Sequence, residues 1–166
     1  MAPRLSEVLI AALVVTVATS LFAADETPSF RTYPAVGSAM IQSPAPVDTS
    51  SSAKARQYRS VLTAAAAAGP NFAGRFTFVA WGCGVACQEF ALVEVESGRV
   101  HFPKSVRLNA YQAVTDGTAP FQYRVDSRLF ILTGAPNDGN ETGIYYYEWT
   151  GEDLRLISRV SKTWPR

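Results

Sequence analysis

The sequence has few of the residues that metal sites and nucleic-acid-binding surfaces require. Among its 166 residues are one histidine and two cysteines, which excludes any metal site that needs four His or Cys ligands from one chain. Fifteen basic residues balance fourteen acidic ones, and a formal net charge of +1 gives no electrostatic reason to expect a nucleic-acid partner. Only 17% of the residues are charged and 48% are hydrophobic, so the chain is not wholly disordered.

The sequence also lacks the short motifs that mark common catalytic and cofactor sites. It contains no G-x-S-x-G, no HExxH and no glycine-rich loop before a helix that would hold a phosphate. His101 is the only histidine, and a lone histidine at the end of a strand is more often structural than catalytic. We therefore expect a protein without enzymatic activity and without a cofactor.

The first residues are arranged as in a secretory signal peptide. Arg4 precedes the run Val8–Ala18, which is apolar apart from Thr16, and small residues follow at Ser20 and Ala23. Such leaders have an apolar region of roughly 7–15 residues, whereas spanning a bilayer takes about 20. We predict that residues 1–23 are a cleaved signal peptide. The mature protein is then periplasmic or secreted and has no stable membrane span.

The mature chain divides into an arm and one domain. Residues 24–52 are rich in proline and serine and predict an extended arm, and residues 53–166 predict a single globular β-rich domain. This domain begins with a helix over residues 53–68, which ends at Gly69 and Pro70. The apolar residues of this helix recur at the spacing of one buried stripe: Tyr58, Val61, Leu62, Ala65 and Ala66.

After Asn71 the pattern changes to strands and turns. Seven short runs have strand character, namely Arg75–Trp81, Glu89–Glu96, Arg99–Phe102, Gln122–Val125, Arg128–Thr133, Gly143–Trp149 and Leu154–Val160. Residues that favour turns separate them. The sequence therefore predicts a mainly β (α+β) fold, a single curved antiparallel sheet or small sandwich of about seven strands in a meander, with one N-terminal helix packed on it.

The two cysteines lie close together in the sequence. Three residues separate Cys83 from Cys87, and Gly82 and Gly84 flank the first of them. An even pair of cysteines in an exported protein most often forms a disulfide, and the glycines relieve crowding in so tight a turn. We predict a Cys83–Cys87 disulfide. The alternative is a redox-active dithiol or, with His101 as third ligand, a copper(I) site, because thiolates and imidazole suit this soft ion.

The sequence around the cysteines carries a resemblance. It reads GPNFAGRF and then WGCGVACQ, with PAPVD upstream. This pattern resembles a group of uncharacterised small exported bacterial proteins, in which a PNFAG turn is followed by WGCG and a second cysteine. The resemblance extends from Pro44 to Pro103. It implies a bacterial envelope setting and no particular substrate.

One strand and one loop are candidates for a ligand surface. Alternation along a strand places Tyr145, Tyr147 and Trp149 on the same face, and aromatic residues are favoured binding anchors. The loop before this strand presents Asn137 and Asp138. We expect an exported non-enzymatic domain that binds a protein or envelope component through this surface, as inhibitors and immunity proteins do. The alternative function is thiol redox chemistry or copper(I) binding by the cysteine pair.

Overall fold

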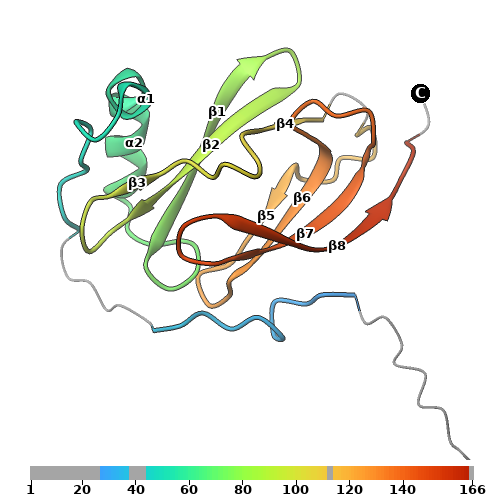
Figure 1. Cartoon of the computed structure of the whole chain (residues 1–166), viewed down its shortest axis with the longest axis horizontal. Helices are drawn as coiled ribbons and strands as arrows, with labels where there is room; N and C mark the ends of the chain where they lie inside the picture. The colour runs from blue at the N-terminus through green and yellow to red at the C-terminus, as the bar shows by residue number, and fades with distance from the viewer. Residues whose placement is uncertain (1–26, 38–43, 112–113, 165–166) are drawn as a thin grey trace, which may run out of the picture.

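The structure of the protein is a computed structural model that describes residues 27–37, 44–111 and 114–164. The predicted signal peptide, residues 1–23, lies outside these ranges. Within them the fold is mainly β: eight antiparallel strands form one open sheet, and two short helices lie against it (Figure 1). Neither of these two helices is long and apolar enough to cross a membrane.

Most strands that are neighbours in the sheet are also consecutive, or nearly so, in the sequence. They are β1 (Phe76–Gly84), β2 (Cys87–Glu94), β3 (Val100–His101), β4 (Leu108–Ala110), β5 (Phe121–Gln122), β6 (Leu129–Pro136), β7 (Gly143–Trp149) and β8 (Leu154–Ser161). Their order is β1-β2-β4-β6-β7-β8, with β3 beside β2 and β5 beside β6. The described sheet thus has eight strands where the sequence predicts about seven, and the added strand is β4.

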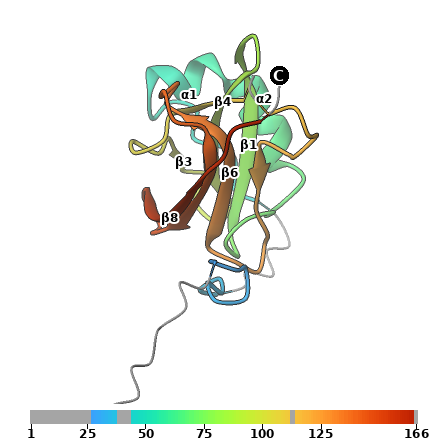
Figure 2. The same cartoon turned by 90° about the vertical axis from the view of Figure 1, so that its right-hand side faces the viewer.

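Strand β4 joins two halves of the sheet: the first half is β1, β2 and β3, and the second half is β5, β6, β7 and β8. It pairs with the start of β2 through residues 108–110 and with the end of β6 through Asn109 and Ala110. The two halves face each other (Figures 1 and 2), and one aromatic core lies between them. Phe78 and Phe90 of the first half lie against Phe130 of the second, with ring centroids 5.3 and 5.5 Å apart.

The helices cover the outer face of the first half. Helix α1 spans Ala53–Gln57 and α2 spans Arg59–Ala66. The predicted apolar stripe lies against the sheet, with Leu62 fully buried. The structure divides the predicted helix 53–68 at Tyr58, whose backbone leaves helical geometry (φ −99°, ψ 18°). The Tyr58 ring stacks on Trp81 of β1 at a centroid distance of 4.3 Å, so packing against the sheet accompanies the break.

Part of the predicted arm is anchored to the outer face of the second half. Phe30 and Tyr33 pack against the cluster of Leu129, Ile131 and Tyr146. The carbonyl oxygen of Tyr33 accepts hydrogen bonds from the backbone N–H of Arg128 (2.8 Å) and from Ser127 Oγ (2.7 Å). Segment 27–37 therefore lies at the end of the molecule opposite the β1–β2 turn (Figures 1 and 2).

Candidate functional site

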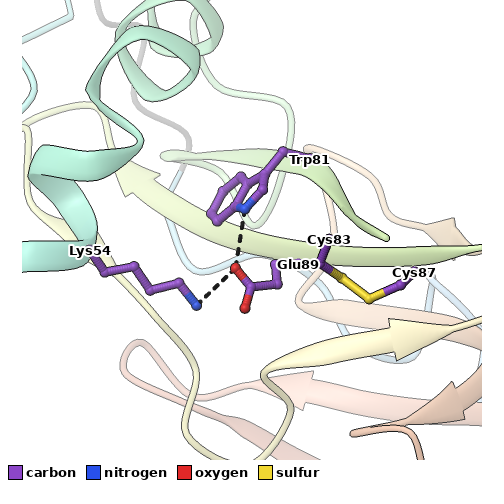
Figure 3. The surroundings of a disulfide bond; sticks show 5 residues. All are labelled: Lys54, Trp81, Cys83, Cys87 and Glu89. Carbon is purple, nitrogen blue, oxygen red and sulfur yellow. Dashed lines mark hydrogen bonds and ion pairs between the residues drawn. A yellow bond between two sulfur atoms is a disulfide. The ribbon is translucent and has the colours of Figure 1, made fainter. Parts of the chain in front are cut away.

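The turn between β1 and β2 projects at one end of the sheet (Figure 1). Cys83 near the end of β1 and Cys87 at the start of β2 form a disulfide, with their Cα atoms 5.2 Å apart (Figure 3). The regular register of the hairpin is broken between Gly82 and Gly84. The predicted disulfide is therefore present, and it closes the tip of the β1–β2 hairpin. We call residues 82–87 the hairpin tip.

The hairpin tip exposes one large apolar side chain. Val85 is 95% exposed, more than any other large hydrophobic residue of the described chain. Ala86 next to it has a positive φ of +49°, a conformation that few residues other than glycine adopt. The carbonyl oxygen of Ala86 accepts a hydrogen bond from the Tyr111 N–H at 2.9 Å. The disulfide and this hydrogen bond both restrain the tip.

The base of the hairpin is fixed against α1. Trp81 Nε1 donates a hydrogen bond to Glu89 Oε2 at 3.2 Å, and Lys54 Nζ lies 3.2 Å from the same oxygen (Figure 3). Trp81 also packs on Tyr58, as described above. Lys54 and Glu89 thus form an ion pair beside Trp81 (Figure 3). The base of the tip is therefore held by a hydrogen bond, an ion pair and a ring contact.

The structure does not bring together the alternative copper ligands. His101 pairs with Leu92, five residues along β2 from Cys87, which is about 16 Å of strand. Its ring makes edge contacts with Phe76 and Trp149, and burial lowers the pKa of His101. The disulfide also occupies both sulfur atoms. The ligand set of Cys83, Cys87 and His101 was therefore the wrong choice, and no group of three His, Cys, Asp or Glu side chains in the described residues is placed to hold a metal ion.

The predicted aromatic surface is also wrong. Tyr145, Tyr147 and Trp149 do share one face of β7, but that face is turned to the core, and their exposed fractions are 7%, 5% and 1%. Strand β7 lies between β6 and β8, so neighbours flank it on both edges. Burial raises the pKa of the Tyr147 hydroxyl. These rings stabilise the fold and are not accessible to a partner.

The loop residues proposed for the same surface have different roles. Asn137 and Asp138 are exposed, and both have positive φ, +57° and +56°. The Asn137 side chain accepts a hydrogen bond from the Arg107 N–H (2.8 Å) and donates one to the Ser105 carbonyl oxygen (2.9 Å). Asn137 therefore positions the connection between β3 and β4. Asp138 remains at the surface, but the aromatic face expected beside it is absent.

Strand β7 also carries a buried carboxylate that the sequence patterns did not indicate. Glu148 is 6% exposed and forms ion pairs with Arg128 and Arg155. The hydrogen bond from Arg155 is the main reason why the pKa of Glu148 is lowered. Because Glu148 alternates with Tyr147 and Trp149, it faces the opposite side of the sheet. Glu148 thus forms structural ion pairs on the outer face of the second half.

Sequence reasoning missed Val85, which is the most exposed large apolar residue of the described chain. A signal was available, because a valine at the centre of a turn closed by two cysteines has no strand face to occupy.

Comparisons with models of protein families, with curated proteins and with solved structures found no significant match to this chain.

Proposed function

We propose that this protein is an exported, non-enzymatic binding module whose hairpin tip enters a recess on a protein partner, in the manner of an inhibitor. The observation that carries this proposal is Val85, 95% exposed on a tip that a disulfide closes. A valine left in water is an apolar group that a partner can bury, with a gain of about 1.5–3 kcal/mol.

The rigidity of the tip supports the same function. Binding costs free energy when loops and side chains lose their freedom, so an element already fixed in its bound conformation binds more tightly. The Cys83–Cys87 disulfide and the hydrogen bond from Tyr111 fix this tip before any partner arrives. A narrow projecting loop is suited to a concave surface, as the long loops of nanobodies are. The shape therefore favours a cleft on the partner.

Export is part of the proposal. A disulfide persists in oxidising compartments such as the bacterial periplasm, and the leader-like start of the sequence and the resemblance to exported bacterial proteins agree with that location. The partner is then a protein of the envelope or of the medium around the cell.

The test compares two exposed valines at opposite ends of the molecule. Val85→Asp places a charge on the hairpin tip, and Val125→Asp places the same charge beside Asp126, whose carbonyl accepts a hydrogen bond from Ala35 in segment 27–37. The mature protein and both variants are immobilised and exposed to an envelope extract of the source organism, and bound proteins are quantified by mass spectrometry. We expect a partner that Val85→Asp retains at least tenfold less than the wild type and that Val125→Asp retains fully. Equal retention by the two variants would show that the tip is not the binding element.

A second candidate function is thiol–disulfide exchange by the same cysteines. The observation that favours it is the exposure of Cys83, which allows an attacking thiolate to reach the disulfide. Equilibration with glutathione buffers of graded ratio, followed by trapping of free thiols, measures how readily the pair is reduced. A pair reduced at the ratios of an oxidising compartment supports exchange, and a pair that stays oxidised in strongly reducing buffer removes this candidate.

A further inference from the structure

A pocket of about 240 Å³ lies between α1 and the connection from β3 to β4. Its lining residues are Lys54, Phe90, Phe102, Pro103, Lys104 and Arg107. The pocket forms on the edge of β2 that faces away from β1, where the partner strand changes from β4 to β3. Glu89 pairs with Leu108 of β4 and Leu92 pairs with His101 of β3, and between these two pairings the connection 102–107 leaves the sheet.

Hydrogen bonds from two other loops hold the connection 102–107 in place. Asp153 Oδ1 accepts hydrogen bonds from the backbone N–H groups of Lys104 (3.0 Å) and Ser105 (3.2 Å). Asn137 holds Arg107 and Ser105 through its carboxamide, as described above. Val106 within the connection is 1% exposed and belongs to the core. The wall of the pocket is therefore formed before a ligand binds.

The pocket combines an apolar floor with cations that lack acidic partners. Phe90 and Pro103 are buried, and the ring of Phe102 lies under Lys54 Nζ at 5.2 Å. Lys54 is already paired with Glu89. Lys104 and Arg107 are exposed, and in the described part of the chain neither side chain forms an ion pair or a hydrogen bond. Two positive charges thus stand free beside an apolar recess.

We propose that this pocket binds an organic carboxylate with a small apolar body. The hydrocarbon part lies on Phe102 and Pro103, with the buried Phe90 behind them. The carboxylate faces Lys104 and Arg107, and the guanidinium of Arg107 offers the two parallel N–H donors that match a carboxylate. Neither Val85 nor the disulfide contributes to this site, so it stands independently of the binding function proposed for the hairpin tip.

The test uses phenylacetate as the probe and follows the backbone amide signals of the intact mature protein by NMR. Phenylacetate is titrated against 2-phenylethanol, which keeps the ring and lacks the charge, and against acetate, which keeps the charge and lacks the ring. We expect saturable shifts confined to residues around the pocket with phenylacetate, and at least tenfold weaker binding of the other two. Equal binding of phenylethanol, or no shift with phenylacetate up to its solubility, would overturn the proposal.

Two charge-matched variants complete the test. Lys104→Gln/Arg107→Gln removes the two free cations of the pocket, and Arg56→Gln/Arg59→Gln removes two exposed cations of α1 and α2 outside it. We expect the first variant to weaken phenylacetate binding at least tenfold and the second to change it less than twofold. An equal loss in both would assign the binding to net charge and overturn the site. The thermal unfolding midpoint of each variant verifies that it is folded.

Discussion

Strand β7 and the hairpin tip are opposite cases of how apolar residues are used. Strand β7 has the densest group of aromatic residues, and its inward rings are at most 7% exposed. The hairpin tip has only one large apolar side chain, and that side chain is 95% exposed. The residues that look most like a binding surface in the sequence build the core, and a single valine at the tip stays exposed.

The difference follows from the position of each element in the sheet. Strand β7 has a neighbour on each edge and the first half of the sheet across from it, so every inward side chain is covered. The centre of the hairpin tip, Val85 and Ala86, lies beyond the last pairing of β1 with β2, that of Gly84 with Cys87, and Ala86 accepts a hydrogen bond there from the Tyr111 N–H. The composition of an element indicates how apolar it is, but the neighbouring elements decide whether its apolar side chains are buried or exposed. Four predictions test this comparison.

The largest effect is expected for Trp149→Ala on β7. This change removes a fully buried ring that contacts Phe76 and His101, and such core truncations cost about 3–5 kcal/mol of unfolding free energy. Urea denaturation followed by circular dichroism measures the loss. A cost below about 0.5 kcal/mol, the range of typical surface changes, would mean that β7 is not a core strand.

The hairpin tip itself should respond less. Replacing both Cys83 and Cys87 by serine removes a crosslink that closes a very short loop, and chain entropy then accounts for about 2 kcal/mol. We expect faster amide hydrogen exchange at residues 84–87 in this variant and unchanged protection in β7. A variant that loses protection in both places would show that the disulfide supports the whole fold.

Glu148→Gln tests the ion pairs on the outer face of β7. Leaving Arg128 and Arg155 without their carboxylate should cost about 1–2 kcal/mol at pH 7. Because the folded pKa of Glu148 is below its ordinary value of 4.5, the stabilisation is complete above that value and is lost as the pH falls through the folded pKa. The difference between wild type and variant in urea denaturation should therefore shrink on acidification.

The control for this prediction is Glu141→Gln. Glu141 pairs with Arg159, but its side chain is 61% exposed, and exposed pairs contribute about 0–1 kcal/mol. A difference from the wild type that is equally large and equally pH-dependent for Glu141→Gln would contradict the role of burial at Glu148.

The smallest effect on stability is expected for Val85→Ser. A fully exposed side chain contributes little to folding, so the unfolding free energy should change by less than about 0.5 kcal/mol. The buried counterpart on the same strand pair is Val79, 6% exposed, where Val79→Ser should cost several times more. Similar costs at both positions would mean that Val85 is covered in solution, and the proposed binding element would be lost.

Several features of the fold could be predicted because they depend on local pattern. The last two predicted strands match β7 and β8 to within one residue at each end. They could be predicted because alternating apolar residues bounded by turn formers specify a hairpin. Ser52 caps α1 by accepting a hydrogen bond from the Ala55 N–H at 3.0 Å, and serine is one of the residues preferred at this position. The cysteine spacing was sufficient to predict the disulfide.

The rest depends on contacts between segments that are distant in the sequence. Strand β4 has three residues, Leu-Asn-Ala, and no pattern of its own, and it is a strand only because β2 and β6 pair with it on either side. The break of the helix at Tyr58 coincides with the stacking of its ring on Trp81, which lies 23 residues further along the chain. The face of β7 that turns inward was set by the first half of the sheet, which no alternation within β7 describes.

The sequence by itself determined seven of the eight strands, the turns between them and the pairing of the two cysteines, because backbone propensity, turn residues and short covalent loops act over a few residues. The tertiary structure decided which apolar groups are covered. It buried the aromatic residues of β7, separated His101 from the cysteines and left Val85, Lys104 and Arg107 at the surface. Burial depends on what lies across the fold, and the one histidine and two cysteines that limit the chemistry of this chain acquire their roles only from that arrangement.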